Sequence, residues 1–334
     1  MTLQVVRPGM LSTFQDLGRT GLQHLGVPVA GAMDERAHRL ANLLAGNAPD
    51  LATIEITMTG PTLRAQSPCC FAISGADLSP TINGHPIPLN RPLIMRAGDE
   101  VAFGERRHGT RCYLAVHGGF DLEPVLGSNS TYLRSGIGPW HGRALRRGDE
   151  LGLRRSFEPG RNNRGITSLA LALSNIEVYL PGPVAQSARR RVRVIKSAQW
   201  REFTPESCVA FLTQTFRISP DSERMGYRLQ GPELSMTQPR QMLSEATTFG
   251  TIQVPAGGQP IVLMADRQTT GGYPKLGYVA SVDLPLLAQL GPGDHVQFEA
   301  IALDTAQQLD LRRTRAFIEL ASALEPIKTM LTNH

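Results

Sequence analysis

Glycine and proline interrupt this chain so often that its regular segments must be short. The 334 residues include 33 Gly and 24 Pro, and turn signals such as RPG, GPT and NGHPI recur in the first block of the chain. Glycine adopts backbone angles that are closed to other residues, and proline lacks the amide donor that regular hydrogen bonding needs. Runs of about five to eight residues with strand-like composition fit between these breaks, for example residues 69–74 and 111–118. The sequence therefore predicts a mainly β protein.

Two segments are exceptions because they carry helical periodicity. In residues 34–45, apolar side chains recur at a spacing of three and four, Asp34 is placed to cap the first turn, and Gly46 is placed to end the helix. Residues 305–324 carry an amphipathic pattern, and its predicted buried stripe consists of Leu309, Phe317, Leu320 and Leu324. We expect one helix within the first block and one near the C-terminus.

The length of the chain favours two domains rather than one. Residues 154–168 lack periodicity and are rich in turn formers, which is typical of a linker. The segments TGPTLRAQSP and QGPELSMTQP share GPxL and a closing proline at equal spacing, so the two blocks resemble each other weakly. We predict an N-terminal β domain at residues 1–160, a C-terminal β domain at 161–303, and a C-terminal helix within 304–334.

Charge and hydropathy exclude two classes of partner. The formal net charge is +5, and the densest basic run is RRRVR at residues 189–193, but it alternates like a strand and has no interleaved aromatic residues. No apolar run approaches about 18 residues, and the N-terminal segment turns polar almost at once. We therefore expect no nucleic-acid partner, no membrane association, and a cytoplasmic location.

Common catalytic and cofactor motifs are missing from the sequence. The eight histidines show no metal-ligand spacing, and GxSxG, GxxxxGK[ST] and a strand-linked GxGxxG do not occur, so we predict no metal site. Lysine occurs only at Lys196, Lys275 and Lys328, and none has the flanking methionines of a biotin carrier. We expect no covalent biotin, and we expect any ATP to be bound outside this chain.

Polar residues are concentrated in the stretch ADRQTTGGYPKLG at residues 265–277. It follows the apolar run IVLMA, and its two glycines allow the backbone to approach a ligand closely and expose amide groups. Residues 245–255, predicted as one strand, add Glu245 and Gln253. The alternative is a hairpin whose side chains only satisfy the turn. The density of polar groups favours a binding loop.

Several longer runs resemble a known family. They include TFQDLGRTGLQHLGVPVAGAMD, AVHGGF, VLGSNSTY, SERMGYRLQGPEL, GTIQVPAGGQPIVLMADRQTTGGYPK and GPGDHVQF. The chain is similar over nearly its whole length to the biotin-dependent carboxyltransferase family, also called allophanate hydrolase subunit 2, which contains the C-type subunit of 5-oxoprolinase and the KipI antagonist KipA. The resemblance implies two cyclophilin-like β-barrel domains with a few helices, and a KipI-like partner, the B-type subunit of 5-oxoprolinase.

The family's chemistry requires a site that recognises an NH group beside a carbonyl. Such a site needs an acceptor for the NH and donors for the carbonyl oxygen or its developing oxyanion. We predict catalytic roles for Lys275, which together with Tyr273 would polarise the carbonyl or hold a phosphoryl group, and for Asp266 and Glu245, one of which would orient the nitrogen. The predicted substrate-binding residues are Arg224, Gln253, Arg267, Gln268, Thr269, Thr270, Gly271, Gly272 and Tyr273.

The resemblance implies that the chain is the C-type subunit of an ATP-dependent 5-oxoprolinase. This heteromeric complex would open 5-oxoproline to L-glutamate together with an A-type subunit and the KipI-like B-type subunit, and the complex rather than this chain alone would use ATP. Two alternatives remain open: a noncatalytic antagonist of a KipI-like histidine kinase inhibitor, and a carboxyltransferase that moves the carboxyl group of carboxybiotin to urea or a similar small amide.

Overall fold

The computed structural model describes residues 1–155, 157, 163–185, 188–238 and 242–332. The chain folds into two compact units. The first unit contains Met1–Gly18, Asp34–Ala185 and Ala316–His334, and the second contains Arg19–Met33 and Gln186–Arg315. Residues 19–33 therefore join the second unit, although most of the first unit follows them in the sequence. The domain boundaries expected from the sequence stay a prediction.

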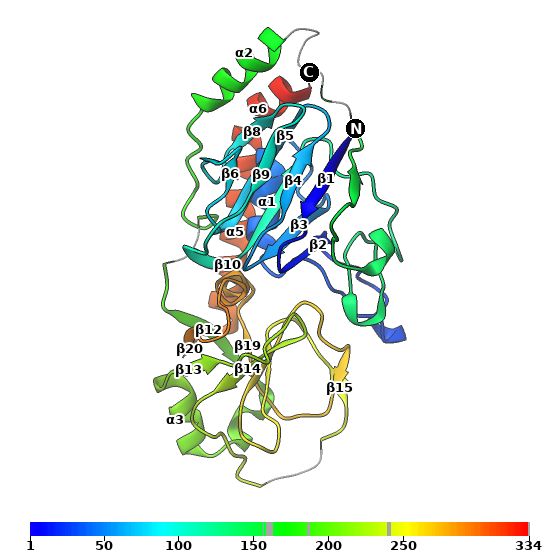
Figure 1. The fold of residues 1–334 in the computed structure, drawn as a ribbon. Helices are drawn as coiled ribbons and strands as arrows, with labels where there is room; N and C mark the ends of the chain where they lie inside the picture. Colours follow the sequence, from blue (N-terminus) through cyan, green and yellow to red (C-terminus); the bar gives the residue numbers. More distant parts are fainter. Residues whose placement is uncertain (156, 158–162, 186–187, 239–241, 333–334) are drawn as a thin grey trace. The chain divides into compact units, whose positions relative to one another are not determined.

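The first unit is built on two antiparallel sheets (Figure 1). The six-stranded sheet has the order β11-β1-β4-β9-β6-β7, and the five-stranded sheet has the order β2-β3-β10-β5-β8. The strand bounds are β1 Thr2–Arg7, β2 Leu11–Gln15, β3 Thr53–Thr57, β4 Thr62–Ala65, β5 Cys69–Asp77, β6 Thr81–Ile82, β7 His85–Pro86, β8 Pro92–Met95, β9 Glu100–Ala102, β10 His108–Val116 and β11 Glu150–Gly152.

One apolar core joins the two sheets of the first unit. Leu3 and Leu63 come from the six-stranded sheet, Ile54 and Leu114 come from the five-stranded sheet, and all four belong to the same buried cluster. Successive strand residues point to opposite faces of a sheet, so the short apolar runs of the sequence supply this core. The prediction of a mainly β protein is confirmed.

Helix α1, Glu35–Leu44, packs against β5 and β10 of the five-stranded sheet. Asp34 precedes it, and its carboxylate accepts a 2.8 Å hydrogen bond from the amide of Ala37, which satisfies one of the free donors of the first turn. Gly46 follows with a φ of 72°, in the left-handed region where glycine is favoured. The predicted helix and both of its end signals are confirmed.

The segment predicted as a linker is wrong in its second half. Helix α2, Asn163–Ser174, begins inside residues 154–168, belongs to the first unit and packs against β8. Residues 156 and 158–162 lie outside the described part of the chain. The helix carries an apolar face, with Leu169 and Leu173 buried. The helical periodicity of this segment was missed in the sequence because the helix starts with residues that also form turns.

The second unit contains a closed barrel of seven strands in the order β12-β19-β16-β17-β14-β13-β20. Only the β12 and β20 pair is parallel; the other neighbours are antiparallel. The bounds are β12 Arg191–Lys196, β13 Phe216–Ile218, β14 Gly226–Gln230, β16 Thr251–Gln253, β17 Ile261–Leu263, β19 Lys275–Val279 and β20 His295–Ala300, with helices α3 Pro205–Thr213 and α4 Leu284–Ala288. Phe211 of α3 stacks on Phe298 of β20 within the core.

The single strand predicted for residues 245–255 is wrong, because the structure divides it. Glu245–Ala246 form β15, which pairs with β18, Thr270–Gly271, as a separate two-stranded sheet. Thr251–Gln253 form β16 inside the barrel. Gly250 lies between them with a φ of 84°, a conformation that ends a regular strand. This break brings β15 beside the polar loop.

The C-terminal segment is helical, as predicted. Helix α5 spans Leu303–Ala323, and α6 spans Glu325–Thr332. Leu320 and Leu324 are buried, as the amphipathic pattern predicts, whereas Leu309 and Phe317 are half-buried. The second of the two helices was not predicted.

Candidate functional site

Lys275 and Glu245 form an ion pair beside the barrel of the second unit. The ammonium nitrogen of Lys275 donates to the Glu245 carboxylate at 2.8 Å and to the carbonyl of Ala246 at 2.9 Å. The Lys275 side chain is 8% exposed, whereas that of Glu245 is 53% exposed. Lysine is rarely buried unless it is paired. The pair therefore places a buried cation directly behind an accessible carboxylate.

Gln253 is the strand neighbour of Lys275. The two residues are opposite each other in the pairing of β16 with β19, so their side chains share one face of the sheet. Gln253 is 1% exposed, and its amide nitrogen has no hydrogen-bond partner among the described residues. An unsatisfied buried donor costs free energy, and in native proteins it calls for an explanation. A ligand acceptor would supply the missing partner.

Gly271 closes the cluster from the other side. It is opposite Glu245 in the β15 and β18 pair. A Cβ atom added at Gly271 would lie 2.7 Å from the amide nitrogen of Gln253 and 3.2 Å from that of Gln268. The two amide side chains therefore converge on a position that only glycine leaves open. Four residues are thus neighbours in space although the chain separates them by up to 30 residues: Lys275, Gln253, Gly271 and Glu245. We call this cluster of side chains and backbone the Lys275 circuit.

The circuit combines hydrogen-bond donors with one carboxylate. An ammonium group has three N–H donors. Two hydrogen bonds from the Lys275 ammonium group go to acceptors among the described residues. The hydrogen bond from Lys275, followed by its positive charge, lowers the pKa of Glu245 below the usual 4.5, so this carboxylate is charged at neutral pH. The arrangement offers donors for a carbonyl oxygen and an acceptor for an adjacent NH group.

The backbone of Lys275 is fixed by residues that the sequence did not single out. The side-chain oxygen of Gln199 accepts from the Lys275 amide at 2.6 Å, and the hydroxyl of Ser197 donates to its carbonyl. Thr247 donates its hydroxyl to the carbonyl of Gln268 at 2.5 Å. Ser197 and Gln199 lie 78 and 76 residues before Lys275 in the chain, and no local motif marks them. Only folding identifies them as supports.

Arg224 and Asp266 form a second, separate ion pair. The guanidinium donates to both carboxylate oxygens, at 2.9 Å and 2.8 Å, and also to the carbonyl of Gly31 at 2.6 Å. Both residues are buried, with 6% and 4% of their surface exposed. The pair ties residues 19–33 to the end of β17. The predicted roles of Asp266 in orienting the substrate nitrogen and of Arg224 in binding substrate stay predictions, and both would require this pair to open.

Arg267 does not point to the Lys275 circuit. Its guanidinium makes long contacts of 3.4 Å to the carbonyls of Met264 and Ala265 and lies over the ring of Phe249. Burial lowers the pKa of Arg267 to about 10, because its charge is poorly solvated. Its predicted role in binding substrate stays a prediction.

The other predicted residues line the loop around the circuit. The carbonyl of Thr269 accepts from the amide of Thr247 at 2.9 Å. Thr270 lies in β18 and is exposed, Gly272 is half-buried, and Tyr273 is 48% exposed. The structure therefore brings together Lys275, Glu245, Gln253, Gln268 and Gly271 and leaves these four at the margin.

The described residues show neither a metal cluster nor a membrane-spanning helix. No group of three or more His, Cys, Asp or Glu residues there has the geometry to hold a metal ion. In the same part of the chain, every helix is too short or too polar to cross a membrane.

Comparisons with known proteins place the chain in a family. The family model described as "Carboxyltransferase domain, subdomain A and B" matches residues 25–300. The Escherichia coli K12 protein named as the C-type subunit of 5-oxoprolinase is 36% identical over 96% of this chain and 97% of its own length. The protein of the same name from Haemophilus influenzae is 38% identical over 89% of this chain and 91% of its own length.

A solved structure gives the same result for the fold. The crystal structure of Kluyveromyces lactis urea carboxylase matches with a TM-score of 0.84 at 27% identity, over 96% of this chain and 29% of that chain. The mainly β fold and the family resemblance expected from the sequence are thus confirmed, with one closed barrel in the second unit. The cyclophilin-like character of the two domains stays a prediction. The chain belongs to the family of carboxyltransferase domains with subdomains A and B.

Proposed function

We propose that this chain is the C-type subunit of a cytoplasmic 5-oxoprolinase that opens the lactam of 5-oxoproline to L-glutamate with hydrolysis of ATP. An A-type subunit and a KipI-like B-type subunit complete the complex, and ATP is bound outside this chain. The near full-length similarity to two proteins named as the C-type subunit of 5-oxoprolinase supports this proposal. The convergence of Lys275, Gln253 and Glu245 at Gly271 is the structural observation that carries it.

The proposed roles follow from the hydrogen-bonding needs of a lactam. The lactam carbonyl accepts from the third N–H of Lys275 and from the unpartnered amide of Gln253, and the lactam N–H donates to Glu245. As water attacks the carbonyl carbon, negative charge develops on the oxygen. The positive charge of Lys275 then stabilises that oxygen more strongly than in the ground state. When the C–N bond of the ring breaks, the nitrogen takes up the proton lost by the water and becomes the amine of glutamate.

The Arg224 and Asp266 pair has a positioning role in this proposal. Its bidentate geometry and burial fix the loop that leads from β17 to Gly271. A rigid loop keeps the donors within hydrogen-bonding distance of the developing charge, which is a condition for efficient catalysis.

Carboxyl transfer to urea or a similar amide is the second candidate, because of the match to a urea carboxylase structure. Urea also has an NH group beside a carbonyl, so the same donors and acceptor would serve it. The role as an antagonist of a kinase inhibitor stays a prediction.

Reconstitution tests the proposal directly. This chain is mixed with candidate A-type and B-type subunits, and 5-oxoproline-dependent ATP hydrolysis and glutamate release are measured with each component omitted in turn. We expect both activities to require all three chains. Activity that is unchanged without this chain would contradict its role in the complex. If the complete complex is inactive, transfer from carboxybiotin to urea with a separate biotin carboxylase would support the second candidate.

A further inference from the structure

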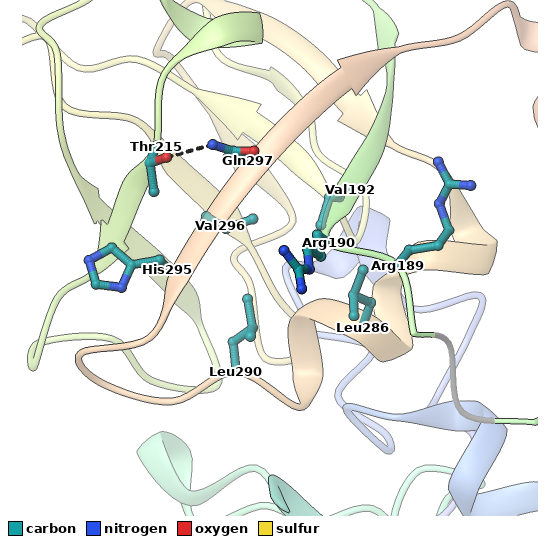
Figure 2. Close-up of a pocket in the computed structure, with 9 residues that line it drawn as sticks. All are labelled: Arg189, Arg190, Val192, Thr215, Leu286, Leu290, His295, Val296 and Gln297. Atoms are coloured by element: carbon teal, nitrogen blue, oxygen red, sulfur yellow. Dashed lines mark hydrogen bonds between the residues drawn. The ribbon is translucent and has the colours of Figure 1, made fainter.

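A pocket of about 390 Å³ lies beside the first residues of β12 and β20 in the second unit (Figure 2). Its apolar wall is formed by Val192 of β12, Leu286 of α4, Leu290, and Val296 of β20. The volume lies in the range of about 300 to 1,000 Å³ that is typical of small-molecule sites. The pocket is therefore large enough for a small organic ligand.

The pocket is distinct from the Lys275 circuit. Val192 is near the start of β12, whereas Lys196 at its end pairs with Gly277, two residues beyond Lys275. Four residues of strand span about 13 Å. None of the residues that line the pocket belongs to the circuit. A ligand in the pocket would leave the proposed lactam site open.

Arg190 supplies the charge of this pocket. Figure 2 shows its guanidinium turned toward Leu286 and Leu290, whereas the side chain of Arg189 extends away from them. Arg189 forms an ion pair with Glu299. Among the described residues, no carboxylate forms an ion pair with Arg190, and no acidic residue lines the pocket. Arg190 is exposed to solvent, and it places a positive charge without a carboxylate partner among the described residues at the mouth of an apolar pocket.

Polar side chains other than carboxylates complete the rim. Gln297 donates its amide to the hydroxyl of Thr215 at 2.7 Å (Figure 2), so these two groups partly satisfy each other. His295 lies at the opposite side of the view from Arg189. The rim thus offers polar contacts without adding a negative charge.

We propose that this pocket binds a small organic acid whose carboxylate pairs with Arg190 and whose apolar body contacts Leu286, Leu290 and Val296. A planar guanidinium matches a carboxylate with two parallel hydrogen bonds. Burial of the apolar body supplies the hydrophobic part of the affinity. A neutral amide of the same shape retains only the hydrophobic part of the affinity.

The test uses phenylacetate and its neutral isostere phenylacetamide, titrated into the full chain and followed by ligand-observed NMR. We expect phenylacetate to bind about three- to fivefold more tightly than phenylacetamide, because an ion pair with an exposed arginine contributes up to about 1 kcal/mol. Arg190→Gln removes this preference and leaves phenylacetamide affinity within about twofold. Arg312→Gln, at an exposed arginine outside the pocket, is the matched control and leaves both affinities unchanged.

Two further variants locate the binding. Leu290→Asp adds a negative charge at the apolar wall and abolishes phenylacetate binding, whereas Lys275→Ala retains it. No binding of phenylacetate up to about 10 mM would overturn the proposal, because even modest ligand efficiency gives a measurable affinity for a ligand of this size. Equal affinities for the acid and the amide would also overturn it. So would a loss of binding in Lys275→Ala with Arg190→Gln unaffected, because the ligand would then occupy the lactam site.

Discussion

The ion pair of Lys275 with Glu245 is asymmetric in its exposure: the lysine side chain is 8% exposed and the glutamate side chain is 53% exposed. The exposed carboxylate of Glu245 lies in water, which screens the attraction within the pair and limits its contribution to stability. The main effect of the ion pair is to fix the position of the ammonium group. Glu245 and the carbonyl of Ala246 hold the ammonium group near the unpartnered amide of Gln253.

Lys275→Ala is expected to lower the reconstituted 5-oxoprolinase activity by about a hundredfold or more, because it removes the charged donor for the developing oxyanion. Glutamate release with saturating ATP measures this effect. Lys328→Ala is the control, because Lys328 is exposed and forms only an i,i+3 pair with Glu325. An activity of Lys275→Ala within about threefold of the parent would contradict the proposed role.

Gly271→Ala is expected to lower activity by about tenfold or more, because the new Cβ atom would lie 2.7 Å from the amide nitrogen of Gln253 and displace it. Thermal unfolding should change little, since the displaced atom ends a side chain. Gly257→Ala is a matched control, because Gly257 is exposed, lies outside the predicted site, and a Cβ atom there would have no neighbour within 4 Å. Equal activities of the two variants would show that the amide position is unimportant.

Asp266→Asn is expected to destabilise the protein by about 3 to 5 kcal/mol, because it removes the carboxylate charge that pairs with the buried Arg224. Urea unfolding measures the loss. A double variant, Arg224→Met with Asp266→Leu, should recover much of it, since neither charge remains buried. Glu35→Gln breaks the exposed Glu35 and Arg39 pair and should cost less than about 1 kcal/mol. Similar losses in Asp266→Asn and Glu35→Gln would refute the structural importance of the buried pair.

Acid is expected to destabilise the first unit through His38. Burial lowers the pKa of His38 from 6.5 to about 4 in the folded protein. As the pH falls, the unfolded chain therefore binds a proton at His38 before the folded protein does. The free energy of unfolding keeps its full value above pH 6.5 and decreases as the pH falls from 6.5 to about 4. The shift corresponds to about 3 kcal/mol.

Urea unfolding between pH 7.5 and 4.5 measures this dependence. His38→Gln should reduce its slope, because the substituted side chain does not titrate in this range. His85→Gln, at an exposed histidine, should leave the slope as in the parent. Identical slopes in His38→Gln and the parent would assign the acid sensitivity to other groups.

Local signals predicted the helices and strands where the relevant interaction is itself local. Asp34 and Gly46 lie within one turn of the helix that they delimit, and the alternation in RVRVIK was a reliable sign of β12. The strand predicted at residues 245–255 failed because the pairing of Glu245 with Gly271 depends on a distant segment. The same reason explains α2, whose apolar face is defined by its contact with β8.

The sequence by itself determined the mainly β class, the capped helix, the family, and the concentration of polar groups that contains Lys275 and Gly271. Tertiary structure alone decided which of these groups act together. It directed Asp266 to Arg224 and Glu245 to Lys275, and it placed Gln253 beside Gly271. The physical reason is that carboxylates, amides and cations can pair in many ways along a chain, and only the register of the strands and the burial of each group select one pairing.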